Sequence, residues 1–261
     1  MIIRNETKGS KPKGGVMKIT FAGCGDAFGS GGRFNTCFHV RCQSSCFLID
    51  CGASSMIALK AQQLDPNEIE TILITHFHGD HFGGLPYFML DAQFFSKRRA
   101  PLQVLGPPGL KERFADVMET AFPGSSKTAP KFELTFEELV PGTSRVVGDK
   151  EITTAQVRHG PPEGPFHAYR IGVDDKVLAY TGDTEWVDEL IEIGHNADLL
   201  IAEAYFYDKK VPLHLDLQTL EGKLHLIHPK RLILTHMNDD MLSRLTELSH
   251  ECAYDGLQVL I

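Results

Sequence analysis

Residues 75–84, Thr-His-Phe-His-Gly-Asp-His-Phe-Gly-Gly, constrain this chain more than any other stretch of its sequence. The apolar and β-branched residues 72–74 before it predict a buried strand, and residues 85–95 after it have apolar side chains at helical spacing. Three imidazoles and a carboxylate therefore lie in a loop between a strand and a helix. Imidazole nitrogens and carboxylate oxygens are ligands of zinc and similar divalent metals.

These side chains are too close together in sequence for all of them to face one ion. His76 and His78 can share one ion, while Asp80 and His81 can turn to a second. The alternative is a solvated loop that happens to be rich in histidine. The flanking strand and the glycine pair at its end favour a metal centre.

Composition and charge narrow the class of protein. The chain has 261 residues, of which 42% are hydrophobic and 23% charged, which is typical of a globular protein with a sizeable core. This length allows one large domain or two small ones. The net charge of −8 provides no overall field that attracts a polyanion such as RNA, although it does not exclude a local basic groove. No run of eighteen apolar residues exists, so no membrane span is predicted.

The first sixteen residues differ from the rest of the chain. They are polar, carry several lysines and lack the apolar core of a signal peptide. We expect a flexible tail over residues 1–16, with Met17 as a candidate natural start, and a folded domain over residues 17–261. Without an export signal, a cytoplasmic location is expected.

Six cysteines are present, and none forms a Cys-x-x-Cys pair. Four of them, Cys37, Cys42, Cys46 and Cys51, fall on two consecutive predicted strands. They could form a third metal site, but their spacing fits no zinc pattern. Reduced, small, buried side chains are the favoured interpretation for a cytosolic protein.

Short apolar runs alternate with segments of helical periodicity along the chain. Strands are predicted over residues 18–22, 36–41, 47–50, 72–74, 102–105, 132–135, 145–147, 151–157, 166–173, 176–180, 198–202, 231–234 and 257–261. Helices are predicted over residues 54–63, 85–95, 110–121, 185–193 and 217–227.

Candidate ligands follow several of these strands directly. His159, Asp183 and His236 each come just after a predicted strand, as the histidine cluster of residues 76–81 does. In layered α/β folds, functional sites are built at strand ends. The combined set could hold two metals, and Asp183 could bridge them with its two oxygens. In the alternative interpretation, Asp183 is only the N-cap of the following helix.

Weaker candidates lie near the amino terminus. A glycine-rich loop over residues 23–33 follows the first strand and could cradle a phosphate, with Arg33 and Asn35 as contacts, or it could be a plain turn. No Gly-Lys-Ser/Thr follows, so it is not a nucleotide P-loop. Asp50 ends a predicted strand, and it could equally well support a ligand histidine or be a turn residue.

The motif of residues 75–84, together with His159, Gly182-Asp183-Thr184 and Leu234-Thr235-His236, resembles the metallo-β-lactamase-fold hydrolases over nearly all of residues 17–261. The resemblance implies a four-layer αββα sandwich, an α/β fold, with two metals at the sheet edges. It also implies the ligand sets: His76, His78 and His159 for one metal, Asp80, His81 and His236 for the other, and Asp183 as the bridge.

Within that family, the chain resembles the phosphodiesterase branch, which includes tRNase Z and the cyclic-phosphate phosphodiesterase of phosphonate breakdown. The resemblance is carried by residues 33–36, residues 168–171, Glu203-Ala204 and His214. It implies that His214 acts on the leaving group or the phosphoryl oxygens, steadied by Glu203. The tRNase Z branch usually has His-Ser-Thr where residues 214–216 are His-Leu-Asp, and no long Gly/Lys-rich arm is present, so a smaller phosphodiester is favoured over RNA.

The expected function is a binuclear phosphodiesterase acting on a small or nucleotide-like phosphodiester, with zinc as the first choice of metal and manganese as the second. A metal-bridging hydroxide would be the nucleophile, oriented by Asp80 and Asp183. There are three alternatives: a tRNase Z-like endoribonuclease, a thioester or lactone hydrolase similar to glyoxalase II, and a non-catalytic metal-binding protein. The thioester or lactone hydrolase would not need Glu203 and His214. A homodimer is left open.

Other conspicuous side chains have ordinary interpretations. Phe28 and Trp186 could wall a substrate pocket but are more often core residues. The remaining histidines are expected at the surface or with satisfied hydrogen bonds in the core: His39, His167, His195, His225, His228 and His250. Of these, His167 is the best candidate for a role in the site.

Overall fold

The computed structural model describes residues 15–162 and 164–261, so nearly all of the predicted tail lies outside the described residues. The strands of the described chain form two seven-stranded sheets. The first has the order β14-β1-β2-β3-β4-β5-β6, and the second β13-β12-β11-β10-β9-β8-β7. In each sheet, one half is antiparallel and the other half parallel.

The bounds of the elements are as follows. The strands of the first sheet are β1 (Lys18–Gly23), β2 (Cys37–Arg41), β3 (Cys46–Ile49), β4 (Thr71–Leu73), β5 (Leu102–Gly106), β6 (Leu134–Glu138) and β14 (Gln258–Leu260). Those of the second are β7 (Thr143–Val147), β8 (Lys150–Gln156), β9 (His167–Val173), β10 (Lys176–Tyr180), β11 (Leu199–Glu203), β12 (Leu232–Thr235) and β13 (Glu251–Cys252). The helices are α1 (Ser55–Ala61), α2 (Gly79–Phe82), α3 (Leu85–Leu90), α4 (Leu110–Ala121), α5 (Glu189–Gly194), α6 (Leu217–Ile227) and α7 (Asp239–Leu242), with short helical turns η1 (Ser30–Gly32), η2 (Pro66–Glu68), η3 (Asp91–Phe95) and η4 (Ser125–Lys127).

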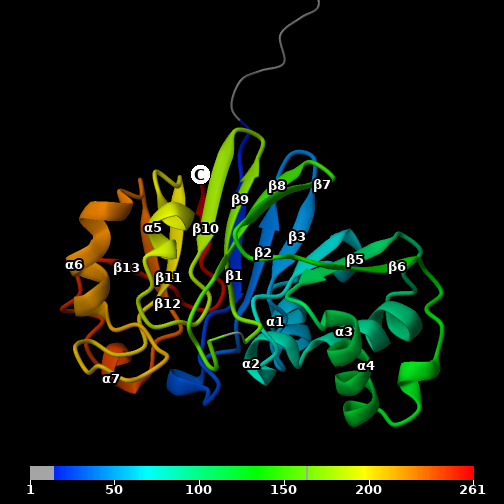
Figure 1. Cartoon of the computed structure of the whole chain (residues 1–261). Helices are drawn as coiled ribbons and strands as arrows, with labels where there is room; N and C mark the ends of the chain where they lie inside the picture. Colours follow the sequence, from blue (N-terminus) through cyan, green and yellow to red (C-terminus); the bar gives the residue numbers. More distant parts are fainter. Residues whose placement is uncertain (1–14, 163) are drawn as a thin grey trace, which may run out of the picture.

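The central strands β3, β4 and β11 bury both of their faces, which is why their sequences are largely apolar rather than alternating. In β3, Phe47 and Ile49 point into the core between the two sheets, whereas Leu48 points to the opposite face and packs beneath the helices of the first sheet. Figure 1 shows α3 and α4 on one outer side of the paired sheets and α5 and α6 on the other. The predicted four-layer αββα sandwich is confirmed.

Most predicted elements are present, but some boundaries are wrong. The predicted helix over residues 185–193 begins only at Glu189, because Glu185 pairs instead with Arg158 in an isolated β-bridge. The strand predicted over residues 132–135 is shifted to β6, and the helix over residues 85–95 changes into a π-helical turn after Leu90. The short elements α2, α7 and β13 were not predicted.

The two sheets are tied together beside the histidine motif. Tyr169 in β9 donates its hydroxyl proton to the carbonyl of Ile74 at 2.6 Å, and the amide of His167 donates to the carbonyl of Thr75 at 3.0 Å. These bonds fix the end of β4 against the second sheet. In the described ranges, no helix combines the length and apolar character needed to span a membrane.

Candidate metal centre

The candidate ligands converge because the strands before them end at one edge of the sandwich. β10, β11 and β12 are mutually parallel, and β8 runs in the same direction, since it and β10 are both antiparallel to β9. Their carboxyl ends lead to His159, Asp183 and His236, with Glu203 as the last residue of β11. Across the interface, β4 leads into the histidine motif.

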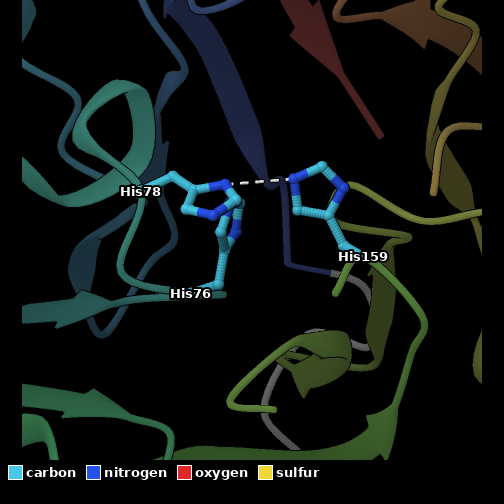
Figure 2. A group of neighbouring side chains, drawn as sticks. All are labelled: His76, His78 and His159. Carbon is cyan, nitrogen blue, oxygen red and sulfur yellow. Dashed lines mark hydrogen bonds between the residues drawn. The ribbon is translucent and has the colours of Figure 1, made fainter. Parts of the chain in front are cut away.

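The first cluster consists of His76, His78 and His159. Their ring nitrogens lie within 4.8 Å of one another, and Nε2 of His159 is 3.1 Å from Nδ1 of His78 (Figure 2). Nδ1 of His159 donates to the carbonyl of Leu213 at 2.8 Å, which leaves Nε2 to face the cluster. Nε2 of His76 is buried and has no partner in the described protein.

The second cluster consists of Asp80, His81, Asp183 and His236, all of them buried. Nε2 of His81 and Nε2 of His236 each lie 3.1 Å from Oδ2 of Asp183. Both nitrogens are also 3.3 Å from Oδ2 of Asp80. Two carboxylates and two imidazoles thus face one another around a common centre.

Asp183 lies between the two clusters. Its Oδ2 is 3.8 Å from Nε2 of His159 in the first cluster, in addition to its contacts in the second. Its Oδ1 is buried without a hydrogen-bond donor among the described residues. An unpartnered imidazole nitrogen in one cluster and an unpartnered carboxylate oxygen between them are donor atoms that a divalent cation would satisfy, so the residues present fit metal ions.

Asp50 supports the second cluster from behind. One of its oxygens accepts a hydrogen bond from Nδ1 of His81 at 2.7 Å, and the other accepts from the backbone amide of Thr75 at 2.7 Å. Asp50 is completely buried and has a positive φ of 60°. Of its two interpretations, the structure therefore favours the partner of a ligand histidine, which fixes the tautomer and orientation of the ring.

The carboxylates control the charge of the second cluster. Burial alone would lower the pKa of His236, but the charge of Asp183 and the contacts with Asp80 and Glu203 raise it to about 10. His81 behaves in the same way, because burial is outweighed by Asp183, Asp80 and Asp50 and its pKa is well above normal. The pKa of His76, by contrast, is lowered by burial and by neighbouring His81. A bound cation would compete with protons for these same ligand atoms.

Glu203 and His214 form a pair beside the second cluster. Nδ1 of His214 lies 2.5 Å from Oε1 of Glu203, whose Oε2 accepts from the amides of Thr184 and Leu215. Burial would lower the pKa of His214, but the hydrogen bond and charge of Glu203 outweigh burial and raise it. The ring of Tyr205 stacks on that of His214 with centroids 4.3 Å apart. The pair is thus rigidly held within 4.8 Å of Asp183 and His236 atoms.

The glycine-rich loop packs against this site. The carbonyl of Cys24 accepts the amide of His236 at 3.1 Å. The side chain of Asn35 donates to the carbonyl of Asp26 and accepts from Ser54, so its amide group braces the loop. Nη1 of Arg33 lies 3.8 Å from Sγ of Cys24. Phosphate binding by Arg33 and Asn35 stays a prediction.

Some neighbours of the site were not predicted. Phe166 packs against all three rings of the first cluster, at centroid distances of 5.4–5.8 Å, and Tyr205 stacks on His214. The available signal was their position in sequence, Phe166 directly before His167 and Tyr205 two residues after Glu203. Phe28, expected more often in the core, is 82% exposed. All six cysteines are free thiols, and all but Cys252 are buried.

The fold and the two clusters define a metallo-β-lactamase-fold protein with a hydrolase-type metal centre. Solved structures support this class: the metallo-β-lactamase fold protein YhfI from Bacillus subtilis is 22% identical, covers 94% of this chain and 100% of its own, and has a TM-score of 0.76. The short form of human tRNase Z, ELAC1, is 25% identical over 93% of this chain and 98% of its own, with a TM-score of 0.76.

A family model described as Anti-Pycsar protein Apyc1 matches residues 17–252, and the chain belongs to this family. Among curated relatives, ribonuclease Z of Methanothermobacter thermautotrophicus is 26% identical over 273 residues, covering 85% of this chain and 87% of the relative. The chain spans about half the length of the mouse and bovine zinc phosphodiesterase ELAC protein 1 sequences that it also matches. The predicted resemblance to the tRNase Z branch is confirmed, whereas the Apyc1 family itself was not predicted.

Proposed function

We propose that this protein is a metal-dependent hydrolase of a small or nucleotide-like phosphodiester. The observation that carries the proposal is the Glu203–His214 pair, which is held beside the second cluster and is not needed for an activated acyl substrate. The names of the relatives, ribonuclease Z and zinc phosphodiesterase, support the same reaction class.

The proposed ligands are His76, His78 and His159 for one ion and Asp80, His81 and His236 for the other, with Asp183 shared. Two ions in these positions would lower the pKa of bound water towards about 7 and neutralise charge on the phosphoryl oxygens. The proposal includes two metal ions per chain, with zinc as the first choice of metal and manganese as the second. Elemental analysis after reconstitution should give near two metals per chain, and a value near zero would refute it.

The residues of the chain supply the remaining chemistry. Asp80 and Asp183 can accept hydrogen bonds from the attacking water and orient it towards phosphorus. His214 can donate a proton to the departing alkoxide from Nε2, because its Nδ1 is taken by Glu203. Glu203 is completely buried and accepts two backbone amides as well, so it aims the His214 ring rather than meeting substrate.

A side-by-side assay tests this assignment. The metal-loaded protein is given bis-p-nitrophenyl phosphate, an alkyl phosphodiester, a thioester, a lactone and a tRNA precursor with a 3′ extension, and an Asp80→Ala variant serves as the control for contaminating activity. We expect turnover of the small phosphodiesters, abolished in the variant. Preferential cleavage of the thioester or lactone would overturn the proposal, and preferential cleavage of the tRNA precursor would move the protein to the ribonuclease alternative.

The proposal extends to the setting of the enzyme. It places one hydrolase domain over residues 17–261, in the cytoplasm, and leaves a homodimer open. Support for the domain comes from the family match over residues 17–252 and from the metal centre that both sheets build. Light scattering of the purified protein would decide between monomer and dimer.

A further inference from the structure

The loop of residues 211–215, here called the His214 loop, contacts the surroundings of both metal clusters through consecutive residues. The carbonyl of Leu213 accepts the Nδ1 proton of His159 in the first cluster at 2.8 Å. The next residue, His214, pairs with Glu203 beside the second cluster. The amide of Leu215 also bonds to Glu203, at 3.1 Å. The conformation at Leu213 therefore decides whether both contacts can be made together.

Leu213 has the conformation that a leucine adopts least readily. Its φ is 73°, in the left-handed region, where a non-glycine residue is strained and persists only if its surroundings hold it. The turn reverses the chain so that the Leu213 carbonyl faces His159 while the following side chain faces Glu203. Pro212 before it and a long hydrogen bond of 3.4 Å from the amide of His214 to the carbonyl of Val211 give this turn local support, and contacts from outside the loop add to it.

Glu185 is a side chain from another loop that contacts this turn. Its Oε2 accepts the backbone amide of Leu213 at 3.1 Å, and its Oε1 lies 3.2 Å from Nε of Arg158. The amide of Glu185 also donates to the carbonyl of Arg158 at 3.0 Å. Since Arg158 directly precedes His159, Glu185 connects the segment that carries the metal ligand to the segment that orients it. Glu185 is in neither metal cluster, and its side chain is 32% exposed.

We propose that Glu185 is a positioning residue: it holds Leu213 in the left-handed conformation, so that the Leu213 carbonyl orients His159 for metal binding and His214 faces the same site. The His214 part of this inference rests on the proposed function, whereas the His159 part concerns metal binding alone. The first cluster and the leaving-group acid are then coupled through one backbone turn. Loss of Glu185 weakens both.

Zinc affinity, measured by competition with a chromophoric chelator, tests the first part without any substrate. Glu185→Ala should lower the affinity for one of the two ions, the one bound by His159, by about tenfold or more, as loss of a ligand's supporting partner does. Glu185→Gln keeps an oxygen that can accept the Leu213 amide, so it should recover most of that loss. Glu189→Ala removes a carboxylate from an exposed position of α5 and should leave the affinity unchanged.

Substitutions at Leu213 test the backbone conformation itself. Leu213→Gly accepts a positive φ readily, whereas the β-branched Leu213→Ile does not. We expect the glycine variant to bind zinc about tenfold more tightly than the isoleucine variant. Equal affinities in this pair, or wild-type affinity in Glu185→Ala, would overturn the proposal.

Kinetics test the second part. In Glu185→Ala saturated with zinc, kcat should fall more on an alkyl phosphodiester than on the nitrophenyl ester, because only the poor leaving group depends on His214. An equal fall on both substrates would contradict the coupling to His214. If the protein hydrolysed no phosphodiester at all, the proposed function would fail, and the zinc affinities of the variants would still decide the role of Glu185.

Discussion

Replacement of His214 by alanine is the most direct perturbation of the proposed chemistry. The ring is held by Glu203 at 2.5 Å and by the stacked ring of Tyr205, and its side chain is 22% exposed. It is thus fixed in place but reachable by a substrate. Alanine removes the proton donor and leaves the ligand sets of both clusters complete.

The size of the effect follows from the role. A positioned general acid contributes roughly 10²–10⁴-fold in rate, or about 2.7–5.5 kcal/mol of transition-state stabilisation. We therefore expect His214→Ala to lose at least about 10²-fold in turnover of an alkyl phosphodiester. The loss on bis-p-nitrophenyl phosphate should be smaller, because nitrophenolate departs without protonation.

Turnover and metal content should be measured on the same preparation. His225, which is exposed on α6 and belongs to neither metal cluster, provides the matched control, and His225→Ala should change neither quantity. Unchanged turnover in His214→Ala would remove this residue from the mechanism. Loss of metal would instead make His214 a ligand, consistent with its place near Asp183 and His236 but not with an acid.

Three further predictions concern metal binding and stability. Gly182 has a φ of 62°, and a Cβ at this position would lie 2.6 Å from the carbonyl oxygen of His167. Gly182→Ala should therefore displace Asp183 and lower zinc affinity about tenfold. In the control Gly172→Ala, the added Cβ would be 3.8 Å from its nearest neighbour, and zinc affinity should not change. Arg98→Ala should lower the free energy of unfolding in urea by about 3 kcal/mol, with metal content retained, because Arg98 is buried and donates to backbone carbonyls that would lose their donor. Burial lowers the pKa of His39 from 6.5 to about 4, so as the pH drops from 6.5 to 4 the unfolded chain is protonated first and the free energy of unfolding falls. His39→Gln should flatten this part of the pH profile of the unfolding free energy. A profile identical to that of the wild type would contradict the assignment.

The parts of the site that could be predicted are those written in consecutive residues. The motif of residues 75–84 contains its own chemistry, and the rule that sites form at strand ends placed His159, Asp183 and His236 with it. Both signals depend only on residues that are adjacent in sequence, and folding does not change that adjacency. The start of α5 was wrong for the opposite reason: Glu185 has a helical neighbourhood in sequence, but its backbone pairs with Arg158, which is distant in the chain.

The supporting residues could not be chosen from the sequence because their roles depend on backbone geometry. Asp50 had two interpretations of equal weight, and only its distance of 2.7 Å to His81 separates them. Leu213 has no chemical signal at all, since it acts through a carbonyl group that every residue carries. What distinguishes it is a positive φ, and its backbone amide is bound by the carboxylate of Glu185 from another loop. Candidate metal ligands can therefore be inferred from residue types. The groups that orient those ligands can be identified only from the backbone conformation of the loops around them.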